Sequence, residues 1–378
     1  MRRLFETHLH TFRFKVSARE SIDLFKRQFK RYNVQKCNFL SLPLDAIYGK
    51  IGPDQTDHID NVRVAYFKQV FSPNGYAYAG LEYKGLDLSD KKAVAKELLR
   101  QVTEYKRLGY DGMKMYEAHP NMRAVLGYEL DDEVYDLYYD YCEKEGIPIT
   151  MHIANPEWMW DYDKVGEYWR SRGCWFDPAI YQSFDGLHQE LLRMMKKHPK
   201  LRLALAHWGF VTSNKVVAEE FMSYPNTMLD ITPGDYQPID EDSEYWKAFI
   251  VKYQDRIFYG TDTYNFEYDK EEKWLKATGA RPEFVIRFLS TKDQFEYNGH
   301  AYNGLNLDEE ILDKIFYKNA SKMLGEPKKL DLDYFINKCE ELLKLEDEKS
   351  LEHYNLWCMK HDFETMKEKG ELTYVKEF

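Results

Sequence analysis

The feature that most constrains the fold is a recurrence of eight short apolar runs, each separated from the next by a helical or loop–helix stretch. Most runs start roughly 30 to 40 residues apart, and several are almost continuously apolar, as strands buried on both faces are. This alternation predicts an α/β fold, a (β/α)8 TIM barrel. A doubly wound open sheet fits the same alternation, but no GxGxxG follows the first run. The expected strands cover residues 4–9, 37–42, 76–81, 112–116, 147–153, 201–207, 227–231 and 256–262.

The stretches between the strands carry helix signals. Ser17 and Glu20 have the spacing of a capping box at the start of a helix over 17–32, and Gly109 and Gly146 end two later helices. Other helices are expected over 54–70, 91–107, 131–145 and 187–197. Residues 155–184 form a long insertion. Beyond Gly325 the chain is charged and helical, which predicts a barrel over 1–325 and a helical C-terminal extension over 326–378, packed outside the barrel or against a partner subunit.

Composition excludes several classes of protein. The net charge is −11, and no basic patch is visible, which argues against nucleic acid and anionic membranes as partners. No apolar run approaches the roughly 18 residues of a membrane span, and no secretory signal is visible. The five cysteines are far apart and never form CxxC, which predicts free thiols. We therefore expect a cytoplasmic protein.

Polar side chains gather where the predicted strands end. Residues two apart on a strand point the same way, so His8 and His10 present two imidazoles to one point. Alone, such a pair more often consists of half-buried histidines without a ligand. In a barrel, however, all strands point the same way, and the side chains at their C-terminal ends meet at one mouth. The residues placed there are His8, His10, Lys114, His152, His207 and Asp262.

Imidazoles combined with a carboxylate suit Zn²⁺ or a similar metal, with one position left for water. We expect one divalent metal, most simply Zn²⁺, with Mn²⁺ as the alternative. Asp262 alone could instead cap a helix, since Gly-Thr-Asp is also turn chemistry. The remaining histidines are interpreted as surface or loop residues: His58, His119, His188, His198, His300, His353 and His361.

With these motifs placed, the chain resembles the amidohydrolase superfamily, and within it the amidohydrolase-related branch that includes the 2-amino-3-carboxymuconate semialdehyde decarboxylase-like enzymes. The resemblance spans roughly residues 4 to 325 in the right order. The matching segments are Thr7-His8-Leu9-His10, Gly112-Met113-Lys114, Ile149-Thr150-Met151-His152, residues 203–209 (LALAHWG), Tyr259-Gly260-Thr261-Asp262 and residues 315–325 (IFYKNASKMLG).

The resemblance implies His8, His10, His152 and Asp262 as metal ligands, and His207 as a catalytic residue or a ligand of a second metal. Lys114 matches a position that bridges two metals as a carbamate in some members. In many members of this branch the site holds one metal, which we expect here. Glu6 departs from the family pattern, because many members have Asp before the histidine pair.

The insertion at 155–184 is the most individual part of the chain and is rich in tryptophan. Loops at a barrel mouth set substrate choice, so Trp158 and Arg170, with Arg172, are candidates for binding a ring-bearing anionic substrate. The same aromatic residues could instead form a dimer interface, because Trp, Tyr and Arg are enriched there.

These residues predict a metal-dependent hydrolase that cuts an amide, a lactone or another ester of a small molecule. Asp262 would move the proton of the attacking water, and His207 would polarise the carbonyl. The alternative is a metal-dependent decarboxylase of a small aromatic or muconate-like acid, with Arg13, Arg170 or Arg172 holding the carboxylate. A third interpretation is a non-catalytic binding barrel. Lys114 is expected to contact substrate or to pair with a buried charge.

Overall fold

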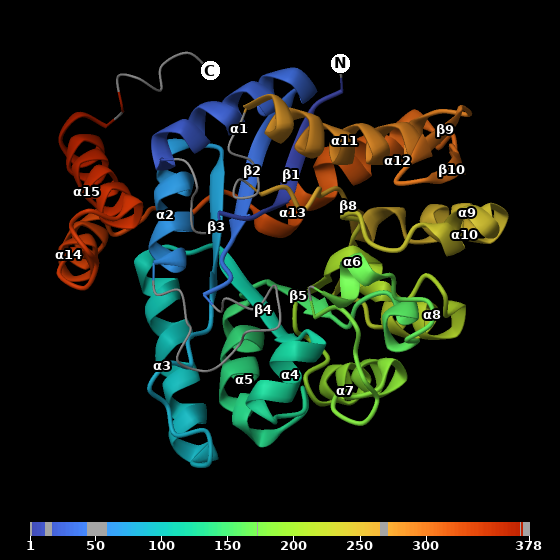
Figure 1. The fold of residues 1–378 in the computed structure, drawn as a ribbon, viewed down its shortest axis with the longest axis horizontal. Helices are drawn as coiled ribbons and strands as arrows, with labels where there is room; N and C mark the ends of the chain where they lie inside the picture. Colours follow the sequence, from blue (N-terminus) through green and yellow to red (C-terminus); the bar gives the residue numbers. More distant parts are fainter. Residues whose placement is uncertain are drawn as a thin grey trace.

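The computed structural model describes residues 2–11, 17–43, 59–171, 173–264, 271–370 and 372. Its eight main strands form one parallel sheet in chain order, β1 to β8, with helices around it (Figure 1). The segment after β8 returns to β1, since Leu9 bridges Thr263 and the His10 amide donates to the Thr263 carbonyl at 2.9 Å. The predicted TIM barrel is therefore confirmed.

The elements follow one another as the sequence predicted, with additional short helices. The strands are β1 (Leu4–Leu9), β2 (Val34–Leu40), β3 (Gly75–Gly80), β4 (Gly112–Ala118), β5 (Ile149–Ile153), β6 (Leu203–Leu205), β7 (Thr227–Asp230) and β8 (Ile257–Phe258). The helices between and beyond the strands are α1 (Ala18–Tyr32), α2 (Asp60–Val70), α3 (Lys91–Leu108), α4 (Pro120–Leu126), α5 (Asp136–Glu145), α6 (Glu167–Arg170), α7 (Phe184–Lys197), α8 (Lys215–Ser223), α9 (Gln237–Glu241), α10 (Ser243–Lys252), α11 (Glu271–Ser290), α12 (Glu309–Asp313), α13 (Asn319–Leu324), α14 (Leu332–Leu343) and α15 (Leu351–Lys369). A small hairpin consists of β9 (Gln294–Tyr297) and β10 (His300–Asn303).

Two strands are much shorter than predicted. The run over 201–207 is a strand only from Leu203 to Leu205, because residues 206–210 form a tight turn with left-handed backbone. The run over 256–262 is a strand only at Ile257–Phe258. Apolar composition marked these segments as buried, but it did not show where extended backbone gives way to turns that carry functional side chains.

The helix signals were largely right. Ser17 and Glu20 form the expected capping box at α1, and Gly109 and Gly146 end α3 and α5 with left-handed backbone. The helix predicted over 54–70 is observed from Asp60, while residues 54–58 lie outside the described part of the chain.

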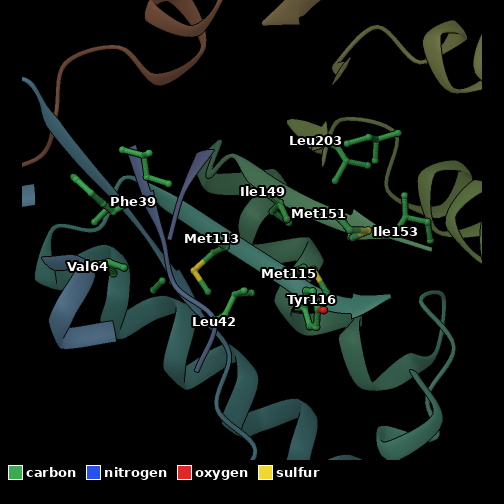
Figure 2. Close-up of a cluster of buried hydrophobic side chains, with 14 of the residues drawn as sticks. Phe39, Leu42, Val64, Met113, Met115, Tyr116, Ile149, Met151, Ile153 and Leu203 are labelled. Carbon is green, nitrogen blue, oxygen red and sulfur yellow. The ribbon is translucent and has the colours of Figure 1, made fainter. Parts of the chain in front are cut away.

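The packing of β4 and β5 determines which side chains face the barrel axis. Met113, Met115, Met151 and their apolar neighbours belong to the large core that the strands share with the surrounding helices (Figure 2). Because successive residues of a strand point to opposite faces, Lys114 and His152 point into the barrel.

A second apolar cluster closes the bottom of the barrel. It is formed by the second residues of four strands, which pack against two residues of α13. This apolar floor lies opposite the C-terminal strand ends, where barrels of this kind hold their sites. The members of the cluster are Phe5, Tyr76, Ala204, Phe258, Ala320 and Met323.

The C-terminal extension packs on the outside of the barrel, which was one of the two predicted arrangements. Helices α14 and α15 lie against each other and contact α2, and α15 also contacts α1 (Figure 1). All five cysteines are free, as predicted. In the part of the chain that the structure describes, no helix has the length and apolarity to cross a membrane.

Candidate metal centre

The candidate site lies where β1, β6 and β8 end. His8 belongs to β1 and His10 follows its last residue, whereas His207 and Asp262 lie in turns after β6 and β8. These two have φ values of 56° and 53°, in the left-handed region that residues other than glycine rarely adopt. Such backbone persists where surrounding structure enforces it, and it concentrates at functional sites.

Four side chains converge at this mouth. The Nε2 atoms of His8 and His10 lie 3.1 Å apart, and Asp262 Oδ1 lies 3.8 Å from the first and 3.4 Å from the second. His207 joins from β6, because ligand atoms of His8, His207 and Asp262 all lie within 4.8 Å of one another. We call these four residues the metal cluster.

The other ring nitrogen of each histidine already has a partner. Nδ1 of His8 lies 2.6 Å from Asp230 Oδ2, that of His10 2.8 Å from the Leu40 carbonyl, and that of His207 3.0 Å from the Pro233 carbonyl. Since all three partners are acceptors, each Nδ1 carries the proton and donates it. Each Nε2 is left with a lone pair directed at its neighbours in the metal cluster.

The charge state of the rings agrees with this arrangement. Burial lowers the pKa of His8 and His10 well below the usual value, and the nearby Lys114 ammonium lowers both further. Burial also lowers the pKa of His207 to about 4. The imidazoles are therefore neutral at physiological pH, which is the form that binds metals.

Comparison with known proteins agrees with the fold. The amidohydrolase family model matches residues 81–325, about two thirds of the chain, which includes Lys114, His152, His207 and Asp262. This chain belongs to the amidohydrolase family. The match begins after His8 and His10, so the placement of this pair beside the other residues comes from the structure.

Several solved structures are similar to this chain at low sequence identity. An uncharacterized TIM-barrel protein from Bordetella bronchiseptica is 15% identical with a TM-score of 0.52, covering 85% of this chain and 98% of its own. "Amidohydrolase 2" from Bifidobacterium longum subsp. infantis is 9% identical (TM-score 0.47; 86% and 100% covered). A 2,6-dihydroxybenzoate decarboxylase is 15% identical (TM-score 0.43; 85% and 99% covered). No curated protein matches the sequence.

The amidohydrolase family generally uses a divalent metal, and the metal cluster fits one. Three imidazole lone pairs and a carboxylate meet, and all of them are acceptors that repel one another without a cation between them. Nitrogen and carboxylate oxygen donors together suit Zn²⁺ and similar ions. His8, His10, His207 and Asp262 are the residues that would hold the ion.

His152 lies beside the cluster and is oriented differently. Its ring centroid is 4.9 Å from that of His207, but its Nε2 lies 3.0 Å from the Ala154 carbonyl. Because that contact occupies Nε2, only Nδ1 is left for a metal in this conformation. Its predicted role as a ligand stays a prediction.

Lys114 points at the metal cluster from β4. Its Nζ lies 3.5 Å from His8 Nε2, and burial lowers the pKa of this lysine to about 8. A lysine with a lowered pKa offers both charged and neutral amine near neutral pH, and the neutral form is the one that can become a carbamate. Its predicted contact with substrate stays a prediction.

Asp230 was not singled out in the sequence. It is the last residue of β7, fully buried, and its two carboxylate oxygens hold the His8 ring and the Thr232 amide, at 2.6 and 3.0 Å. A carboxylate behind a metal-binding histidine fixes the orientation and tautomer of the ring. The signal that could have found Asp230 is its position, because the other site residues also lie at strand ends.

Arg281 on α11 was also missed. Its guanidinium donates to the Asp262 backbone carbonyl and, at 3.2 Å, to Asp262 Oδ2, and a further N–H donates to Tyr264 Oη. These contacts hold Asp262 in its strained turn. No local pattern marks this residue, since it lies far along a helix that faces the mouth only after the barrel closes.

Glu6, the departure from the family pattern, supports the barrel and not the ligand rings. Its carboxyl accepts from the amides of His8 and Thr261, at 3.1 and 3.0 Å, and from the Thr261 hydroxyl at 2.8 Å. Burial raises the pKa of Glu6 to about 8. Glu6 therefore joins β1 to the segment after β8, which carries Asp262.

The insertion packs largely on itself. Met159, Val165 and Phe176 form a small core, and Trp158 and Trp160 lie against it. Phe176 reaches toward the mouth, where its ring lies 5.9 Å from His119, which in turn lies 5.2 Å from His152.

Of the predicted substrate contacts, Lys114 lies beside the metal cluster, whereas Arg170 and Trp158 contact other residues of the insertion. Arg170 is paired within the insertion, with the Tyr162 carbonyl and Glu167, and lies over the Tyr162 ring. Trp158 lies against Trp169. Both roles stay predictions, and Arg13 and Arg172 lie outside the described residues.

The interpretation as surface or loop residues was wrong for His188, which is buried within α7 and whose Nε2 donates to the Gly209 carbonyl at 2.9 Å. His119 and His198 do lie in loops, but both rings are buried. His119 caps α4 and contacts Asn155, and His198 lies beside Asp136 and Asp140. His58 lies outside the described residues.

Proposed function

We propose that this member of the amidohydrolase family is a metal-dependent hydrolase that cuts an amide, a lactone or another ester. The observation that supports the proposal is the convergence of three Nε2 lone pairs and the Asp262 carboxylate, with every Nδ1 already bonded to an acceptor. A histidine cluster that served packing alone would not need its ring nitrogens to face one another and a carboxylate.

When bound, a divalent metal supplies a water of lowered pKa and polarises the bond to be cut. Asp262 is the base, since its partly exposed carboxylate lies within the cluster and accepts the proton of the attacking water. It then returns that proton to the leaving group. Arg281 keeps the carboxylate oriented through Oδ2 and the backbone carbonyl.

His207 acts as a metal-binding residue in this proposal. To polarise a carbonyl it would need a proton on Nε2, but its proton lies on Nδ1 and its pKa is lowered to about 4 by burial. The N–H donor for a substrate oxygen is assigned to Lys114.

The test is a metal analysis of the purified chain followed by a substrate screen. We expect about one divalent ion per chain and hydrolysis of at least one compound in a panel of amides, lactones and esters. Chelation should abolish the activity, and Zn²⁺ or Mn²⁺ should restore it. A protein that retains no metal, or that turns over none of these bonds when loaded, contradicts the proposal.

A decarboxylase is the second candidate, and Arg281 is the observation that favours it. A carboxylic acid at the mouth needs a cation, and the Arg281 guanidinium lies beside Asp262, 3.2 Å from its Oδ2. The screen separates the two reactions when aromatic and muconate-like acids are included, because only decarboxylation releases CO₂.

A further inference from the structure

The C-terminal extension lies beyond the family match, which ends at residue 325. We propose that helix α15 of the C-terminal extension positions His10, acting through the buried Arg63 of α2. Glu352 on α15 and Arg63 on α2 are thus positioning residues for the metal cluster, and the proposal rests on the metal site proposed above. α15 lies beside α2 in Figure 1, on the outside of the barrel wall.

Arg63 connects the extension to the end of β1. Its side chain is fully buried, and its Nη2 donates to Glu352 Oε1 at 2.9 Å. Its Nη1 donates to the Thr11 carbonyl and to Asp60 Oδ1, both at 2.9 Å. Thr11 follows His10 directly, so the guanidinium fixes the backbone next to a residue of the metal cluster.

The same group of charges also fixes the partner of the His10 ring. Asp60 Oδ2 accepts from the Ser41 hydroxyl at 3.0 Å and from the Leu42 amide, just after β2 ends. The Leu40 carbonyl, two residues earlier, accepts from His10 Nδ1 at 2.8 Å. His10 is therefore held from its own strand through Thr11 and from β2 through Leu40, and both routes pass through the Arg63–Asp60 pair.

The charges explain why Glu352 matters to this arrangement. The buried Arg63 guanidinium lies between the carboxylates of Asp60 and Glu352. Its Nη1 contacts Asp60, and its Nη2 contacts Glu352. With Glu352 neutral, Arg63 loses a charge-assisted partner and is drawn further toward Asp60. That movement changes the contacts to Thr11 and to the end of β2, whereas the Arg63–Asp60 pair remains.

Other contacts fix α15 in register over this region. Asn355 Oδ1 accepts from the Ala18 amide at the start of α1 at 2.9 Å. Asp362 accepts from Arg19 at 2.7 Å and from Tyr66 Oη on α2 at 2.6 Å. α15 thus bonds to the first turn of α1 and to Arg63 and Tyr66 of α2, so Glu352 is held in place and is not a flexible surface side chain.

The test compares two isosteric changes on the same helix. Glu352→Gln removes the charge that contacts Arg63, and Glu364→Gln removes a charge that pairs with Lys360 at the surface. Zn²⁺ affinity is measured on the full chain by competition with a chromophoric chelator. Hydrogen exchange of the amides of residues 8–11 is measured on the metal-free protein, and thermal unfolding is recorded for both variants.

We expect Glu352→Gln to weaken Zn²⁺ binding by about 10-fold, the low end of the range for groups that support metal-binding histidines. It should also speed exchange at residues 8–11, while Glu364→Gln changes neither quantity. A lower melting temperature for Glu352→Gln with unchanged Zn²⁺ affinity and unchanged exchange would show a merely structural role and overturn the inference. If the wild type binds no Zn²⁺, the proposed function fails, and exchange in the metal-free protein still decides whether α15 supports β1.

Discussion

The metal cluster and the insertion after β5 both lie at the C-terminal ends of the strands, but their side chains are held in different ways. Each histidine of the cluster is buried and has a partner from another strand or loop: Asp230, Leu40 or Pro233. The insertion has a small core of its own, and Tyr162, Tyr168 and Trp169 are 41–58% exposed.

This difference separates two functions. A site whose residues are fixed from several strands can hold reacting groups at constant distances, which catalysis needs. A segment that packs on itself can change without disturbing those distances, so it is suited to selecting a substrate or a partner. Both roles weighed for the insertion, substrate binding and a homodimer contact, stay predictions. Changes in the cluster should therefore have large effects on chemistry and metal binding, and changes in the insertion small ones.

The largest effect is expected for Asp262→Asn. The amide cannot take the proton of the attacking water, so kcat should fall by about 10²–10⁴-fold, the usual contribution of a general base. The measurement is kcat on a substrate from the screen, together with the melting temperature. Activity close to that of the wild type would exclude Asp262 as the base.

The second largest effect concerns the pH dependence of stability that comes from a buried carboxyl group on β4. Burial raises the pKa of Glu117 on β4 from 4.5 to about 7. The Glu117 carboxyl binds its proton more tightly in the folded chain than in the unfolded chain. Its contribution to the free energy of unfolding is therefore fully present at low pH and is lost as the pH rises from about 4.5 to about 7. The loss is at most about 3 kcal/mol.

Glu117→Gln should remove this decline. The free energy of unfolding, measured with urea at pH 5 and pH 8, should fall less over this interval in the variant than in the wild type. Glu167→Gln, on the exposed side of the insertion, controls for the loss of one carboxylate. Equal declines in the wild type and in Glu117→Gln would show that burial of Glu117 does not produce the effect.

A smaller effect is expected for Asp230→Asn. The His8 ring loses the carboxylate that fixes its tautomer, so Zn²⁺ affinity should fall by about 10- to 100-fold. Chelator competition measures the loss, and Asp255→Asn, which removes an exposed carboxylate, is the matched control. An affinity equal to that of the control would mean that Asp230 does not orient the ligand.

The smallest effect is expected for Arg170→Gln in the insertion. If Arg170 contacts an anionic substrate at an exposed position, KM should rise by a factor of about 5 or less, since such pairs contribute about 1 kcal/mol or less. Both kcat and Zn²⁺ affinity should stay unchanged. A large fall in kcat would contradict the distinction between the metal cluster and the insertion, because it would make the insertion part of the catalytic machinery.

Sequence periodicity determined most of the architecture. Apolar runs separated by helix signals predict the barrel, because strands buried on both faces must be apolar and parallel strands need crossover helices. The same logic placed His8, His10, His207 and Asp262 at one end, since the C-terminal ends of all strands in a barrel face the same way. Helix caps at Ser17, Gly109 and Gly146 were readable because they are local chemistry.

The tertiary structure decided which groups surround the residues of the candidate site. The partner of His8 is Asp230, 222 residues away, and only closure of the barrel brings the two within 2.6 Å. The contacts of Arg281 with Asp262 and of Glu352 with Arg63 likewise form only in the folded chain. A strand pattern states which way a side chain points, but which ring nitrogen carries the proton depends on the atom that faces it, and in this protein those atoms come from distant parts of the chain.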